Sequence, residues 1–136
     1  MKTNKKLLLL IITLMIAFAG CKKYDDGPTI SIMPKKMRLD RTWKVEKTIT
    51  AGQTTTGSND NTVQFKGDGT VISSMILGSG TFTNNGTWEF GSKKETIRIT
   101  YGSSTSEATI LRLTTKEFWI KDNSFPETET HFIPSK

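Results

Sequence analysis

The stretch "TWKVEKTI", residues 42–49, alternates bulky apolar side chains with polar ones. Trp43, Val45 and Ile49 fall on one face of an extended chain, and the residues between them are charged or hydroxylated. Successive side chains of a β-strand point to opposite faces, so a period of two predicts a strand with one buried side.

The same period of two recurs along the chain after this stretch. "TVQF" (62–65) and "ETIRITY" (95–101) repeat it, and glycine or asparagine turns such as 67–69 and 84–86 separate the apolar runs. These residues supply the backbone conformations that tight hairpins need. We expect about eight strands, near residues 42–50, 61–66, 70–77, 80–90, 95–101, 105–114, 116–121 and 127–133. Helix is expected for one turn at most, within residues 34–40.

The connections between these predicted strands are all of hairpin length. Short antiparallel strands at a spacing of about ten residues are typical of a sandwich or an up-and-down barrel. A sandwich needs longer crossings between its sheets. The sequence therefore predicts an all-β fold, a single antiparallel up-and-down barrel of about eight strands.

Four segments in order extend this prediction: "LDRTWKVEKTIT" (39–50), "VQFKGDGTVIS" (63–73), "GTWEF" (86–90) and "ILRLTTKEFWI" (110–120). Their order and spacing resemble those of the bacterial lipocalin-like lipoproteins of the Bacteroidota type. The resemblance implies a lipocalin-like, calycin-type barrel over residues 37–136, with Trp43 closing its floor. The chain departs from the family pattern in two places. Arg41 stands where the first strand has glycine, and the last strand lacks the arginine that packs on the first tryptophan.

The amino terminus has the features of a secretory signal peptide. Three lysines precede Leu7–Ala19, an apolar run that as a helix spans about 20 Å, short of a hydrocarbon core of about 30 Å. Small residues then lead to Cys21, an order similar to the lipobox at which a lipidated cysteine becomes the first residue. Phe18 stands where that pattern prefers leucine, and residues 17–19 would also suit an ordinary signal peptidase that cuts after Ala19.

Cys21 is the sole cysteine of the chain, so it has no partner for an internal disulfide. Lipidation would remove this reactive thiol, and we interpret Cys21 as the lipid attachment site. Residues 1–20 are then the signal peptide, and residues 21–36, with two prolines and a charged run, form a flexible tether. The acidic pair in "KKYDD" (22–26) is similar to export signals of surface lipoproteins. The expected location is the cell envelope, anchored to the outer membrane and facing the periplasm or the cell surface.

The net charge of +6 belongs partly to the signal peptide, and without residues 1–20 it is +3. The remaining excess of basic residues lies in 22–47, beside the expected anchor. No base-reading motif accompanies this charge, so we expect no nucleic-acid partner. A tether lying next to anionic headgroups explains the charge more simply.

Residues with catalytic or metal-binding chemistry are scarce. The chain has one histidine, His131, and its one cysteine is assigned to lipid, so neither a nucleophile–base pair nor a zinc site is expected. Asp60 and Asp68 lie in turn sequences, where aspartate ordinarily accepts backbone hydrogen bonds. His131 is expected at the surface or rim. The sequence thus predicts no enzyme, no metal and no cofactor.

The inside of the barrel remains as the candidate site, because an eight-stranded barrel is either filled by side chains or holds one small ligand. Candidates for its interior or for a ligand lining are Trp43, Phe65, Phe82, Trp88, Phe90 and Phe118. Trp119 should face outward, toward a partner or the tether. Two functions stay open: a binding module for a small apolar ligand, or a solid-barrel interaction domain of a cell-envelope protein complex. A pocket of a few hundred Å³ at one barrel end would favour the first.

Overall fold

The structure of the protein is a computed structural model, and it describes residues 33–58 and 60–136. The predicted signal peptide, Cys21 and most of the tether lie outside these residues. The elements are, in chain order, α2 (Lys35–Leu39), β1 (Arg41–Thr50), β2 (Gln53–Thr56), β3 (Asn61–Phe65), β4 (Thr70–Leu77), β5 (Gly80–Phe90), the 3₁₀ turn η1 (Ser92–Lys94), β6 (Thr96–Tyr101), β7 (Ser104–Leu113), β8 (Phe118–Asp122) and β9 (Thr128–Pro134). The helical turn expected before the first strand is confirmed as α2.

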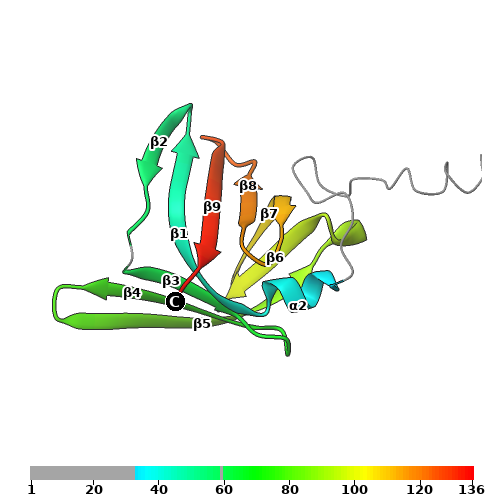
Figure 1. Ribbon diagram of the computed structural model, residues 1–136, viewed down its shortest axis with the longest axis horizontal. Helices are drawn as coiled ribbons and strands as arrows, with labels where there is room; N and C mark the ends of the chain where they lie inside the picture. Colours follow the sequence, from blue (N-terminus) through cyan, green and yellow to red (C-terminus); the bar gives the residue numbers. More distant parts are fainter. Residues whose placement is uncertain (1–32, 59) are drawn as a thin grey trace, which may run out of the picture.

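Strands β1 and β3–β9 form a closed antiparallel barrel (Figure 1). Each strand pairs with the next along the chain, and β9 returns to pair with β1 from Trp43↔Pro134 to Thr50↔Thr128. The predicted eight-stranded up-and-down barrel is therefore confirmed. All eight strands lie within the described residues, so a chain that begins after the predicted signal peptide retains the whole barrel.

The ninth strand, β2, was not predicted. It folds back on the carboxyl-terminal half of β1 through a two-residue turn at Ala51 and Gly52, whose φ angles of 49° and 79° lie in the left-handed region. Such a turn matches the twist of a hairpin. The sequence of β2, "QTTT", has no apolar alternation and all four residues are exposed, so it offered no pattern to detect.

The floor of the barrel lies where α2 meets the start of β1. Leu39 and Trp43 are fully buried, and the Trp43 indole Nε1 donates a hydrogen bond of 3.0 Å to the Leu39 carbonyl oxygen. Arg38 Nη1 donates to the Leu113 carbonyl oxygen at 2.8 Å, which ties α2 to the end of β7. The helical turn is thus fixed across this end of the barrel.

Arg41 has a role at this floor that its place in the sequence did not suggest. Its guanidinium carbon lies 5.6 Å from the centroid of the Trp43 ring, and its Nη1 donates to the Thr115 carbonyl oxygen. The barrel closes through β1 and β9, and β9 contains no arginine. The cation over the Trp43 ring comes from the first strand.

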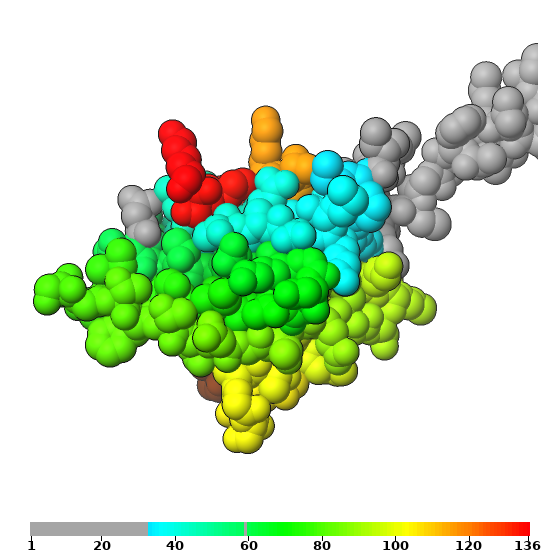
Figure 2. Space-filling view, turned by 90° about the horizontal axis from the view of Figure 1, so that it is seen from below, coloured from blue at the N-terminus to red at the C-terminus, as the bar shows by residue number. Residues whose placement is uncertain are grey.

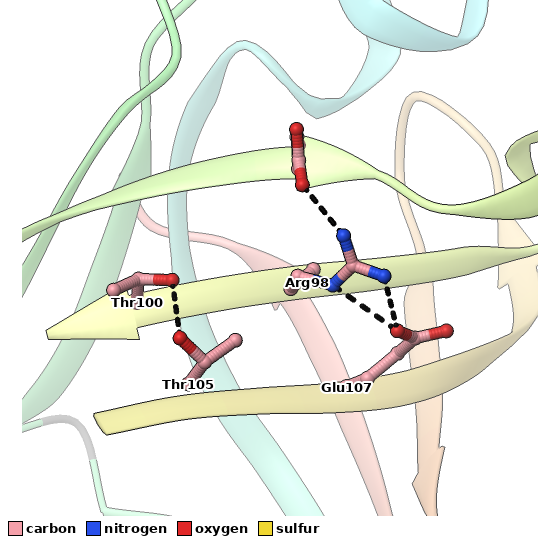
Figure 3. A network of polar contacts seen from close by, with 5 residues as sticks. Arg98, Thr100, Thr105 and Glu107 are labelled. Carbon is pink, nitrogen blue, oxygen red and sulfur yellow. Dashed lines mark hydrogen bonds and ion pairs between the residues drawn. The ribbon is translucent and has the colours of Figure 1, made fainter. Parts of the chain in front are cut away.

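On the outer wall, a row of charged side chains crosses β5, β6 and β7 (Figure 3). Arg98 lies between Glu89 and Glu107 in the strand register and contacts their carboxylates at 2.8 and 2.9 Å. The neighbouring side chains of Thr96 and Arg98 hold the pKa of Glu107 below its usual value. Exposed pairs of this kind add little stability. Their consequence is geometric, because Arg98 facing outward places its neighbours Ile97 and Ile99 inside.

The β4–β5 hairpin extends beyond the rest of the barrel wall (Figure 1), and its tip projects from the side of the molecule in Figure 2. β5 pairs with β4 from Gly80 to Thr87, but with β6 only from Thr87 to Phe90. In the described part of the chain, no strand pairs with the other edge of residues 80–86. Residues 69–88 contain no charged side chain. The hairpin is therefore an uncharged projection with one open strand edge.

Candidate functional site

A cavity of about 500 Å³ lies inside the barrel, between its floor and the β4–β5 hairpin. Nine of its lining residues are apolar: Val45, Val63, Phe65, Met75, Phe82, Ile99, Phe118, Ile120 and Phe132. Seven are polar but uncharged: Asn61, Thr62, Ser73, Ser74, Thr83, Asn84 and Tyr101. A volume of this size and such a lining are typical of small-molecule sites.

The bottom of the cavity is a set of interlocking aromatic rings. Phe65 and Phe118 meet edge to face with centroids 5.7 Å apart, and Phe118 packs on Trp43 at 5.6 Å. Phe65 also meets the edge of Trp88 at 5.7 Å, and the Trp88 Nε1 donates to the Lys66 carbonyl oxygen at 2.9 Å. The base is thus solid, and the free volume lies above it.

The mouth of the cavity lies beside the hairpin. Met75 and Phe82 are direct cross-strand neighbours that both line the cavity, yet they are 44% and 63% exposed. Nearby Leu77, at the hairpin tip, is also exposed. Exposed apolar side chains grouped in this way commonly mark binding sites. An apolar ligand could therefore pass from this surface into the cavity without crossing a charged rim.

A pair of hydroxyl groups joins two walls of the cavity. The Tyr101 hydroxyl at the end of β6 is hydrogen-bonded to Ser73 Oγ in the middle of β4. The Tyr101 ring reaches this position by lying against Gly86 of β5, where an added Cβ would come within 2.6 Å of the ring and 2.3 Å of the Thr100 carbonyl oxygen. Glycine is therefore required at position 86 for the pair to form.

A smaller chamber of about 300 Å³ shares Ile99 and Ile120 with the first. It is more polar, and its lining includes Thr128, Thr130 and Asp122. The Ser124 backbone N–H donates to Asp122 Oδ1 at 2.8 Å and holds the pKa of that carboxyl below its usual value. Asp122 is therefore negatively charged at neutral pH.

The six aromatic residues proposed for the interior occupy three levels of the barrel. Phe65 and Phe118 line the cavity from below, and Phe82 lines it at the mouth. Trp43 and Trp88 are buried beneath the cavity and do not line it. Phe90 packs edge to face on Trp88 with centroids 5.3 Å apart. The structure thus brings three of the six to the cavity and places the others in the packed base.

Trp119 and His131 lie on the outer face of the barrel. They are cross-strand neighbours whose rings stack with centroids 4.1 Å apart and an interplanar angle of 13°, and the guanidinium carbon of Arg112 lies 5.1 Å from the centroid of the Trp119 ring. His131 is only 4% exposed and is hydrogen-bonded through Nε2 to the Glu129 carboxylate. The expectation of a surface or rim histidine was therefore wrong, because the indole of Trp119 covers the imidazole.

Carboxylates in the turns make local hydrogen bonds. Asp68 Oδ1 accepts the Thr70 backbone N–H at 2.8 Å, which holds the pKa of Asp68 below its usual value, and Asp60 accepts the Ser58 hydroxyl. The backbone hydrogen bond expected of a turn aspartate is confirmed for Asp68, whereas the Asp60 carboxylate accepts a side-chain hydroxyl. Within residues 33–58 and 60–136, no three His, Cys, Asp or Glu side chains gather as a metal site would require. The same residues include no helix that is long and apolar enough to span a membrane.

The barrel architecture is similar to that of solved structures from Bacteroides species. No protein-family model and no curated protein matches the chain. A lipocalin-like protein from Bacteroides uniformis superposes with a TM-score of 0.64 at 13% identity, over 72% of this chain and 99% of that one. The fold is lipocalin-like. An uncharacterized protein from Bacteroides eggerthii superposes on the barrel with a TM-score of 0.59 at 12% identity, over 71% of this chain and 99% of that one. At these identities the likeness shows the fold alone.

Proposed function

We propose that this protein is a non-catalytic binding module for a small apolar ligand, held at the cell envelope by a lipid on Cys21. The observation that supports ligand binding is the apolar cavity of about 500 Å³, open beside Met75 and Phe82. A solid barrel would have no such space. The cavity is large enough for one small molecule, and its aromatic base offers contact area without a reactive group.

The membrane anchor is proposed from the sequence. Residues 1–20 have the order of a bacterial lipoprotein signal, and Cys21 follows at once. The barrel begins close after this point, with α2 at Lys35. Residues 22–34, if extended, would reach about 45 Å, far enough for the barrel to stand clear of the outer membrane.

Filling the cavity should abolish ligand binding. Val63 lines the cavity from β3, and its neighbour Gln64 does not. In Val63→Trp the indole would occupy the ligand's space, and we expect affinity for the uncharged fluorophore N-phenyl-1-naphthylamine to fall more than about tenfold. Gln64→Trp adds the same group to the opposite face of the strand and should bind like wild type.

Fluorescence titration of the chain from residue 21 with Cys21→Ser measures both variants, and thermal melts check that each is folded. A folded Val63→Trp that binds as tightly as wild type would place the site elsewhere. Native mass spectrometry of protein purified from its own host should show a retained ligand and give its mass.

A second candidate, an interaction domain, is favoured by the open edge of β5. Along residues 80–86 this edge presents backbone N–H and C=O groups that can pair with another strand. These residues carry no charged side chain that would oppose such pairing. The simplest partner is β5 of a second copy. In that case the chain should be a dimer by light scattering, and Thr83→Lys, which adds a charge on the edge strand, should be monomeric. A wild-type monomer at every concentration tested would contradict pairing between copies.

A further inference from the structure

The charge of the lining side chains bears on which ligands the two chambers inside the barrel can hold. In the described part of the chain, the larger chamber is lined by no acidic or basic side chain, and the charged side chain that faces the smaller one is the acidic Asp122. Glu107 also borders the smaller chamber, but its carboxylate faces the outer wall and is paired there with Arg98. Among residues 33–58 and 60–136, no lysine, arginine or histidine lines either chamber.

This lining discriminates between classes of apolar ligand. Burial of an ionised carboxylate or sulfonate without a cation is strongly unfavourable, and the nearby negative charge of Asp122 adds repulsion. An uncharged molecule with the same apolar body pays neither cost. An anionic amphiphile would have to leave its head group in water and lose contact with part of the cavity.

The Ser73–Tyr101 pair offers a place for an uncharged polar group. Each hydroxyl has one donor and two acceptor positions, and the bond between them uses one donor and one acceptor. One donor and several acceptor positions remain on the cavity wall. A ligand hydroxyl, which both donates and accepts, would satisfy them, while the aromatic rings of Phe65 and Phe118 contact the apolar body.

We propose that the ligand is an uncharged amphiphile, with an apolar body on the aromatic base and a hydroxyl group at Ser73 and Tyr101. This inference rests on the proposed ligand-binding function and narrows it to one chemical class. It excludes fatty-acid anions as the preferred cargo.

Two dyes with the same ring system test the charge. N-phenyl-1-naphthylamine is uncharged, and 1-anilinonaphthalene-8-sulfonate differs from it by one sulfonate. We expect the chain from residue 21 with Cys21→Ser to bind the uncharged dye at least about tenfold more tightly. Equal or tighter binding of the sulfonate would overturn this inference and leave the proposed function standing. Binding of neither dye, with no displacement by decanol, would count against the proposed function itself.

A matched pair of lysine variants tests the cause of the preference. Asn84 and Asn85 are exposed neighbours on β5, and only Asn84 lines the cavity. Asn84→Lys supplies the missing cation and should raise affinity for the sulfonate dye and for decanoate about tenfold. Asn85→Lys, with the same net charge on the opposite face, should not. Equal gains in the two variants would mean that overall charge, rather than the cavity lining, sets the preference.

Tyr101→Phe tests the hydroxyl site. Loss of one hydrogen bond should weaken decanol binding about three- to tenfold and leave 1-chlorodecane, which has no hydroxyl, unchanged. Displacement of the uncharged dye measures both ligands. An equal loss for both would assign Tyr101 a structural role only and overturn the placement of the hydroxyl group.

Discussion

Replacement of Trp43 by alanine should unfold the barrel or leave it with little residual stability. The Trp43 side chain is fully buried, packs on Phe118, and donates its indole hydrogen bond to Leu39. Removal of such a side chain typically costs about 3–5 kcal/mol, out of about 5–15 kcal/mol for a whole domain. Alanine would also leave the guanidinium of Arg41 without the ring beneath it.

Trp119→Ala is the matched control, because it removes an indole from the outer face. Sequence alone suggested a loss within about 0.5 kcal/mol, as for an ordinary surface residue. The stacking on His131 and the contact with Arg112 raise the expected loss to about 1–2 kcal/mol. Denaturant melts of the two variants give the comparison. Equal midpoints, or a larger loss at Trp119, would show that the floor does not depend on Trp43 as argued.

The barrel could be predicted from sequence because its signal is repeated in several strands and in the turns between them. Period-two alternation marks the inward face of β1, β3 and β6, and turn residues mark most of the hairpins. β2 escaped detection because it covers nothing and so needs no apolar face. The open edge of β5 escaped for another reason. The edge is open because β5 extends beyond the residues that pair with β6. The extent of that overlap depends on the register between the two strands, which the sequence of one strand alone does not reveal.

The cavity could be predicted only in part. Alternation identifies which side chains point inward, but their height along the barrel depends on strand tilt and stagger. By alternation alone Trp43 and Phe82 looked equivalent, and the family resemblance implied a floor position for Trp43 only; Trp43 lies below the cavity and Phe82 at its mouth. The Ser73–Tyr101 pair joins strands that are not neighbours, and the one local hint is the glycine at position 86.

We expect Cys21→Ser to abolish association of the protein with membranes. Stable attachment needs about two acyl chains, since each buried methylene contributes about 0.8 kcal/mol and one myristoyl chain binds only marginally. A diacylglyceryl group on Cys21 supplies two chains. Serine cannot form the thioether, so the variant should remain as a full-length precursor or be released as a soluble exported protein.

Labelling with a palmitate analogue and partition into detergent should separate the outcomes. Wild-type protein should be labelled and enter the detergent phase, and Cys21→Ser should do neither. Phe18→Leu is the control, because it restores the residue that the lipobox pattern prefers and should be labelled at least as well as wild type. Labelling of Cys21→Ser, or its continued partition with detergent, would contradict the assignment of Cys21. Ligand binding by that same soluble variant should be unchanged, because residues 33–136 contain all eight strands of the barrel and the whole lining of its cavity.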